Sequence, residues 1–291
     1  MLYHVDLTTP ETVARQTNTV NPDGSMPALI VNQASGQYVN FFAFVTEMCQ
    51  AASKIIAEQT MRSFVPYIAD LDLVWEDVRD DVCYDRYLKM PDDLLILSEL
   101  TFGDLTIGSS DYRLSPTNTT PYDTLYLSPN AMDGAVYEWG AMYTLSGTWG
   151  YVQNISQAWT LAQASLSIGS TTVTTITVTV DTAVNYERLQ YLKIGSEYMQ
   201  ITGIDTDTDI LTVIRGVNGT TAAIHASAAL YHFNVIDDVK KAATELAVYF
   251  YTRRTSSGNV QFSDGSMAID DYPVATKDLI KDYRRGRWAR K

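Results

Sequence analysis

Two groups of aspartates are the residues of this 291-residue chain whose types and spacing could support chemistry. The segment Asp205–Asp209 alternates aspartate with threonine, a spacing that could present carboxylate oxygens to Ca²⁺. It bridges two strand-like runs, however, and it lacks the glycine and the distal glutamate of a helical calcium loop. We therefore interpret it as a solvated hairpin tip. Asp77, Asp80 and Asp81 form the second carboxylate group.

The remaining residues that commonly act in catalysis are few and scattered. His4, His225 and His232 do not have the helical spacing of zinc ligands. The two cysteines, Cys49 and Cys83, form neither a metal motif nor a disulfide framework, and Cys49 falls on an apolar stripe where we expect a buried thiol. The sequence contains no phosphate-binding glycine loop and no nucleophile elbow. We expect no enzymatic activity, no cofactor and no metal.

Charge is segregated along the chain. The formal net charge is −13, yet residues 284–291, RRGRWARK, contain five basic groups and no acidic one. Without them the chain carries −18, and such an acidic body disfavours nucleic-acid binding because phosphate is repelled. The basic terminus can be a solubilising tail or a docking peptide. Trp288 favours docking, since an exposed indole contributes nothing to a purely solvated tail.

The chain shows no signal for secretion or for a membrane. Its first 18 residues lack a basic stretch followed by an apolar run, so we expect no signal peptide and an intracellular product. No apolar stretch approaches the length of a membrane span.

Helical periodicity occurs near both ends of the chain. Apolar residues recur at helical spacing from about Tyr38 to Arg62 and again from Asp237 to Arg254, with Asp237 expected as an N-cap. Pro273 begins a short further helix. We expect the two long helices to pack together, because neither can bury its apolar face alone. Residues 1 to about 36 are polar and are expected to form an extended or irregular arm.

The middle of the chain has the period of strands. Short alternating runs begin at Pro91 and are separated by turn residues. Alternating runs at 171–180, 191–195, 197–203 and 210–215 follow, and Asn218-Gly219 predicts a turn with positive backbone angles. The fold class expected is α+β: a helical frame formed by N- and C-terminal helices, with a large β-rich insertion that makes a small barrel- or sandwich-like lobe.

Several of these stretches together resemble known structural proteins. Tyr191–Phe233, with its Arg215-Gly216 and Asn218-Gly219-Thr220-Thr221, resembles a β-module that recurs in neck and tail proteins of tailed bacteriophages. The remaining stretches occur in the same order as in the head–tail connector, or adaptor, family that they resemble: QTMRSF (59–64), LKMPDDLLIL (88–97), DYRLSPTN (111–118), GTWGY (147–151) and DDVKKAATELA (237–247). The likeness extends from about residue 38 to the C-terminus.

The resemblance implies a part of a particle. It implies a ring, usually dodecameric, that sits below the portal at the virion neck, after synthesis in the host cytoplasm. Genomic DNA passes through its channel without sequence-specific binding, and the partners are the portal protein and a tail-side neck or tail-terminator protein. The residues expected to dock on the portal are Arg284, Arg285, Arg287, Trp288, Arg290 and Lys291. The large β-rich middle departs from compact members of the family.

The expected organisation follows from the resemblance and the periodicity together. Residues 1–36 form the arm, 37–159 and 234–283 the adaptor core, 160–233 the inserted β lobe, and 284–291 the basic tail. A second interpretation is a tail or baseplate binding module whose β lobe contacts glycans or the host, with Trp139, Trp149 and Trp159 as an aromatic surface. The helical frame and the basic tail favour the adaptor, because a glycan-binding module needs neither.

Overall fold

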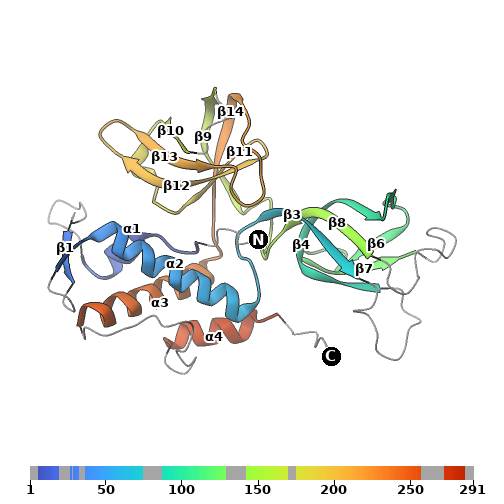
Figure 1. Ribbon diagram of the computed structural model, residues 1–291, viewed down its shortest axis with the longest axis horizontal. Coiled ribbons are helices and arrows are strands. Elements are labelled where there is room, and N and C mark those ends of the chain that lie inside the picture. Colours follow the sequence, from blue (N-terminus) through green and yellow to red (C-terminus); the bar gives the residue numbers. More distant parts are fainter. Residues whose placement is uncertain are drawn as a thin grey trace. The chain divides into compact units, whose positions relative to one another are not determined.

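The computed structural model describes residues 6–19, 27, 29–32, 37–74, 87–128, 142–169, 175–256 and 272–285. Helices and antiparallel sheets both occur in it, so the α+β class is confirmed. Its contacts divide the chain into two compact units (Figure 1). Unit 1 joins Met1–Met61 to Trp159–Arg285, and unit 2 contains Arg62–Ala158.

This division differs from the boundaries expected from the sequence. The sequence predicts that residues 160–233 form a separate insertion and that residues 62–158 belong with the helices. In the structure the strands of 159–233 share unit 1 with the helices, whereas those of 62–158 hydrogen-bond among themselves in a separate sheet. The physical reason is a set of buried polar contacts between the N-terminal segment and 187–200, described below.

Four α-helices lie in the described part of unit 1. They are α1 Pro10–Gln16, α2 Phe41–Thr60, α3 Asp237–Ser256 and α4 Val274–Tyr283. Thr9 caps α1 by accepting a hydrogen bond from the Thr12 N–H, and Asn40 caps α2 by accepting one from the Ala43 N–H. Asp237 is the first residue of α3 rather than its cap, since the Lys240 N–H donates to the Ile236 carbonyl.

Helix α1 corrects the expectation of an irregular arm over residues 1–36. Thr9, Pro10 and Glu11 together are a start signal for a helix: a capping hydroxyl, a proline at the first helical position and an acid in the first turn. A two-stranded sheet, β1 Leu29–Asn32 with β2 Gln37–Asn40, also lies in or next to that segment.

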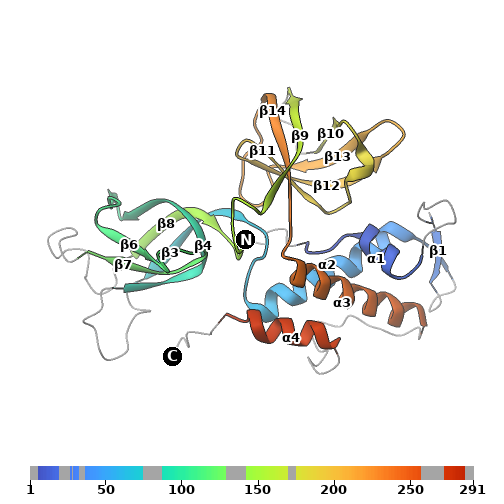
Figure 2. The same cartoon turned by 180° about the vertical axis from the view of Figure 1, so that it is seen from behind.

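The two long helices lie side by side in both views of the molecule (Figures 1 and 2). Tyr251 of α3 meets the rings of Phe41 and Phe44 edge to face, with centroids 6.5 and 5.9 Å apart. Leu246 on α3 is fully buried. The packing expected between these sequence-distant helices is therefore present.

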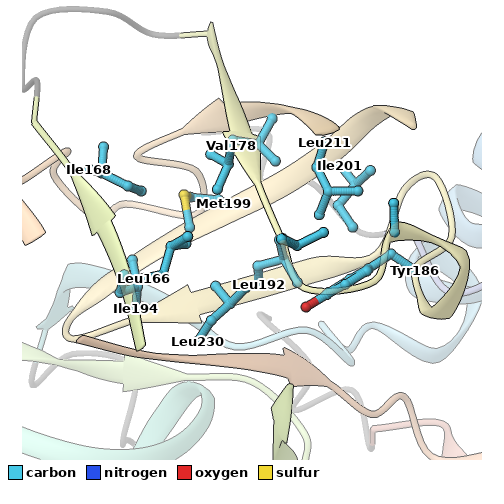
Figure 3. Packing of buried hydrophobic residues seen from close by; sticks show 13 residues of the cluster. Leu166, Ile168, Val178, Tyr186, Leu192, Ile194, Met199, Ile201, Leu211 and Leu230 are labelled. Atoms are coloured by element: carbon cyan, nitrogen blue, oxygen red, sulfur yellow. The ribbon is translucent and has the colours of Figure 1, made fainter. Parts of the chain in front are cut away.

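The β lobe is a six-stranded antiparallel sheet curled into a half-barrel, with strand order β10-β13-β12-β11-β14-β9. Its strands are β9 Trp159–Ile168, β10 Thr175–Thr179, β11 Tyr191–Ile194, β12 Glu197–Asp205, β13 Ile210–Arg215 and β14 His225–Phe233. Side chains from all six strands and from the short helix η3, Ala183–Asn185, fill its inside (Figure 3). Asn218 and Gly219 have φ of 54° and 80°, as predicted.

Unit 2 is a second antiparallel sheet, with strand order β3-β8-β4-β7-β6 and β5 paired to β4. Its strands are β3 Tyr67–Val74, β4 Tyr87–Phe102, β5 Leu105–Thr106, β6 Tyr112–Ser115, β7 Tyr122–Leu127 and β8 Met142–Trp149. Trp149 and Tyr143 are fully buried. Gly147 lets β4 approach, because a Cβ there would lie 2.4 Å from the Ile96 carbonyl oxygen.

Replacing Leu246 with Asp should unfold unit 1. The change places an unpaired carboxylate between α2 and α3, at a cost of several kcal/mol. The matched control is Lys241→Asp at an exposed position of the same helix, which should change the free energy of unfolding by no more than about 0.5 kcal/mol. Thermal and urea unfolding measure both variants. A soluble Leu246→Asp protein with unchanged melting would show that this packing does not hold the unit together.

Candidate functional site

The aspartates at the hairpin tip are used to build the turn. Asp205 Oδ1 accepts hydrogen bonds from the N–H groups of Asp207 (3.0 Å) and Thr208 (3.2 Å). Hydrogen bonds from the Thr208 side chain and from these amides lower the pKa of Asp205. Asp209 Oδ1 accepts the Ala183 N–H at 2.7 Å. In the described part of the chain no three His, Cys, Asp or Glu residues gather as a metal site would require. Asp77, Asp80 and Asp81 lie outside the described residues.

The remaining sequence candidates are dispersed. Trp149 is buried in unit 2 and donates its indole N–H to the Ala69 carbonyl at 2.9 Å, while Trp159 packs on Tyr198 and Phe233 in unit 1. The buried Trp149 is not presented to a ligand. Cys49 is buried as expected, and burial raises the pKa of its thiol. His4, Cys83 and Trp139 lie outside the described residues.

A buried ionic cluster fixes one end of the β lobe. Arg215 donates from Nε and Nη2 to the two carboxylate oxygens of Glu197 at 2.7 and 2.6 Å, and both side chains are inaccessible to solvent. His225 Nε2 lies 2.8 Å from Glu197 Oε2, and the Ala223 N–H donates to the same oxygen at 3.0 Å. The cluster joins β12, β13 and β14 and fastens the 216–224 loop. Its geometry is that of a structural anchor.

The N-terminal segment joins the helices to the lobe. We call residues Asp6–Gln16 the joint. The Leu7 N–H donates to Ser53 Oγ on α2 at 2.9 Å, and the Thr8 hydroxyl lies 2.7 Å from the Thr244 hydroxyl on α3. On the lobe side, Gln200 Nε2 donates to Asp6 Oδ2 at 2.6 Å. The joint thus contacts both halves of unit 1 through buried polar atoms.

Charged pairs extend this contact along α1. Arg188 Nη1 donates to Glu11 Oε1 at 2.6 Å, and the Arg188 guanidinium lies 3.9 Å from the centroid of the Phe42 ring on α2. Burial raises the pKa of Glu11, although Arg188 opposes the shift. Burial alone would also raise the pKa of Glu187, but hydrogen bonds from Thr9 and Arg15 leave it below its ordinary value.

A hollow of about 290 Å³ lies beside the joint. Asp6, Thr8, Tyr191, His232 and Lys240 are among the residues that line it. Burial lowers the pKa of His232, so its imidazole is neutral at pH 7. The lining carries two acidic side chains, Asp6 and Asp237, and one basic side chain, Lys240.

The residues predicted to dock on a portal lie at the end of the described chain. Arg284 and Arg285 directly follow α4, Arg284 is exposed, and the Arg285 N–H donates to the Thr60 carbonyl at the end of α2 (2.9 Å). The chain therefore leaves unit 1 from the place where α2 and α4 end. Arg287, Trp288, Arg290 and Lys291 lie outside the described residues.

No family model and no curated protein matches the chain. Of the helices in the described ranges, none has both the length and the apolar character needed to cross a bilayer.

Replacing Glu197 with Gln should destabilise the lobe by about 3–5 kcal/mol at neutral pH, because Arg215 is left buried without its counter-ion. Burial acts to raise the Glu197 pKa, but hydrogen bonds from Arg215, Ala223 and His225 leave it lowered. A carboxyl group whose pKa is lowered by folding stabilises the folded protein at pH values above its unfolded-state pKa, which is near 4.5. This stabilisation is lost as the pH falls through the folded-state pKa. The gap between the two proteins should therefore close in acid.

Melting curves at several pH values test this, with Asp207→Asn, an exposed carboxylate of the same lobe, as the control. A Glu197→Gln protein that melts with the parent at neutral pH would contradict the role assigned to the cluster.

Proposed function

We propose that this chain is a structural virion protein: a head-to-tail adaptor that forms a ring below the portal and around the DNA channel. Copies surround the channel, the portal protein contacts one side, and a tail-side neck or terminator protein contacts the other. The dodecameric stoichiometry and the location at the virion neck come from the family that the sequence resembles.

The observation that carries the proposal is the pairing of α2 with α3. Helix α2 runs into the stretch QTMRSF, of which it contains Gln59 and Thr60, and α3 contains the stretch DDVKKAATELA. The resemblance places these two stretches at the two ends of an adaptor core. The β-rich segments between them then form a large insertion in a helical frame. Because α2 and α3 pack against each other, the helical frame can be kept when the size or sequence of the β-rich segments between them changes.

Charge supports the same function. The body outside 284–291 carries −18, so a wall built from it repels phosphate and lets DNA slide. The basic terminus begins at Arg284, directly after the last residue of α4. A basic segment with one tryptophan suits a docking site on a partner protein.

The side chains that could have acted in catalysis also favour a structural protein. Glu197, Arg215 and His225 bond to one another inside the lobe, and Asp205 and Asp209 close turns. The alternative of a glycan-contacting module in a tail or baseplate has less support, because Trp149, one of its three aromatic candidates, is fully buried.

Removing the basic tail should abolish docking on the portal. Deleting 284–291 would also remove the Arg285–Thr60 hydrogen bond, so the sharper variant ends at Arg285 and lacks 286–291. We expect it to fold and to have the melting temperature of the parent. It should fail to complete DNA-filled heads, because four of the six docking side chains are removed. Complementation of heads that lack the protein measures this.

Two further variants separate charge from the indole. One replaces Arg287, Arg290 and Lys291 with Gln, and the other replaces Trp288 with Ala. Each should weaken docking, and only the first should reduce its dependence on salt, because Arg284 and Arg285 keep their charge. Normal particle completion by the protein without 286–291 would overturn the assignment of the tail.

A further inference from the structure

The sheet of unit 2 ends in two strands of opposite charge. In the order β3-β8-β4-β7-β6, β3 and β6 are the two edges, and each pairs with one described strand only. Residues 62–158 contain fifteen acidic and five basic side chains, a formal net charge of −10. Any exposed base in this unit is therefore surrounded by acids that could pair with it.

Arg113 on β6 is such a base. Arg62 and Lys89 are in ion pairs with Asp93 and Asp123, whereas Arg113 has no ion pair among the described residues. Its guanidinium lies 5.0 Å from the centroid of the Tyr126 ring, on the face turned away from the buried Leu125 and Leu127. Stacking leaves the N–H groups in the guanidinium plane directed outward.

The surface around Arg113 is hollowed. Ser110, Tyr112, Tyr126 and Ser128 line a depression of about 230 Å³ beside it. Tyrosine and arginine are the side chains that most often dominate the affinity of protein interfaces. The β6 edge thus presents an arginine beside a depression lined by tyrosine and serine side chains.

Strand β3, at the opposite edge, carries the matching charge. Asp70 and Asp72 are both exposed, and they face away from the core as Arg113 does. Asp72 accepts a hydrogen bond from the Thr144 hydroxyl at 2.7 Å, and neither carboxylate has a basic partner in the described part of the chain. Because β3 and β6 are opposite edges of the same sheet, their complementary charges can meet only when the β6 edge of one molecule contacts the β3 edge of another.

We propose that the β6 edge of one copy docks on the β3 edge of the next, with Arg113 against Asp70 and Asp72. Opposite charges on adjacent strands attract, whereas β3 against β3 or β6 against β6 would place like charges together. The contact is therefore head-to-tail, the kind of interface that closes into a ring. This inference rests on the proposed function and specifies which surface links the copies.

Reciprocal charge reversal tests the contact on the full-length chain. Arg113→Asp and the double change Asp70→Arg with Asp72→Arg should each raise the concentration at which the protein self-associates by at least about tenfold, because each puts like charges at the interface. An equimolar mixture should associate as the parent does, since each variant then supplies the partner that the other needs. Sedimentation velocity across a concentration series measures association, and melting curves show that each variant is folded.

The matched control is Lys54→Glu on α2, which reverses an exposed charge in unit 1 and should leave association unchanged. The proposal is wrong if the parent does not associate, if either variant associates as the parent does, or if the mixture fails to recover. These outcomes are distinct from failure of the proposed function, which is judged by whether protein lacking 286–291 completes particles.

Discussion

Unit 1 depends on one constraint: each of two buried carboxylates, those of Asp6 and Glu11, must have a hydrogen-bond partner. Asp6 and Glu11 are each only 7% exposed, and a buried charge is tolerated only when it is bonded. Asp6 bonds to Gln200 and Glu11 to Arg188, both in the β lobe, while the chain around Asp6 and Glu11 bonds to α2 and α3. Helices and lobe are consequently one compact unit, in which side chains of the lobe bond to both carboxylates.

The parts of the fold with local periodicity could be predicted from the sequence. The helices from Phe41 and from Asp237, and the hairpins of the lobe, follow from the spacing of apolar residues and from turn residues such as Asn218-Gly219. The joint could not. Its buried residues include both polar and apolar side chains, and Gln200 donates to Asp6, which lies 194 positions earlier, a relation that leaves no periodic trace. Only the start signal of α1, Thr9-Pro10-Glu11, was available, and it says nothing of what the helix touches.

The candidate docking site is predictable in part for the same reason. The basic composition of 284–291 can be read from the sequence. The position of its first two residues beside the end of α2, however, depends on the hydrogen bond from the Arg285 N–H to the Thr60 carbonyl. Charge is unevenly distributed along the chain: residues 62–158 carry −10, residues 1–61 and 159–283 together carry −8, and residues 284–291 carry +5. In the adaptor that we propose, this distribution would serve both the binding of protein partners and the release of DNA, because only the terminus carries an excess of positive charge.

The mass of the complex formed with the portal tests the central claim most directly. Native mass spectrometry of the purified chain, before and after it is mixed with portal rings, should show a complex whose added mass is a fixed multiple of the 32.4 kDa chain, matching the symmetry of the portal. A portal ring that binds no copies, or a variable number of them, would contradict the account.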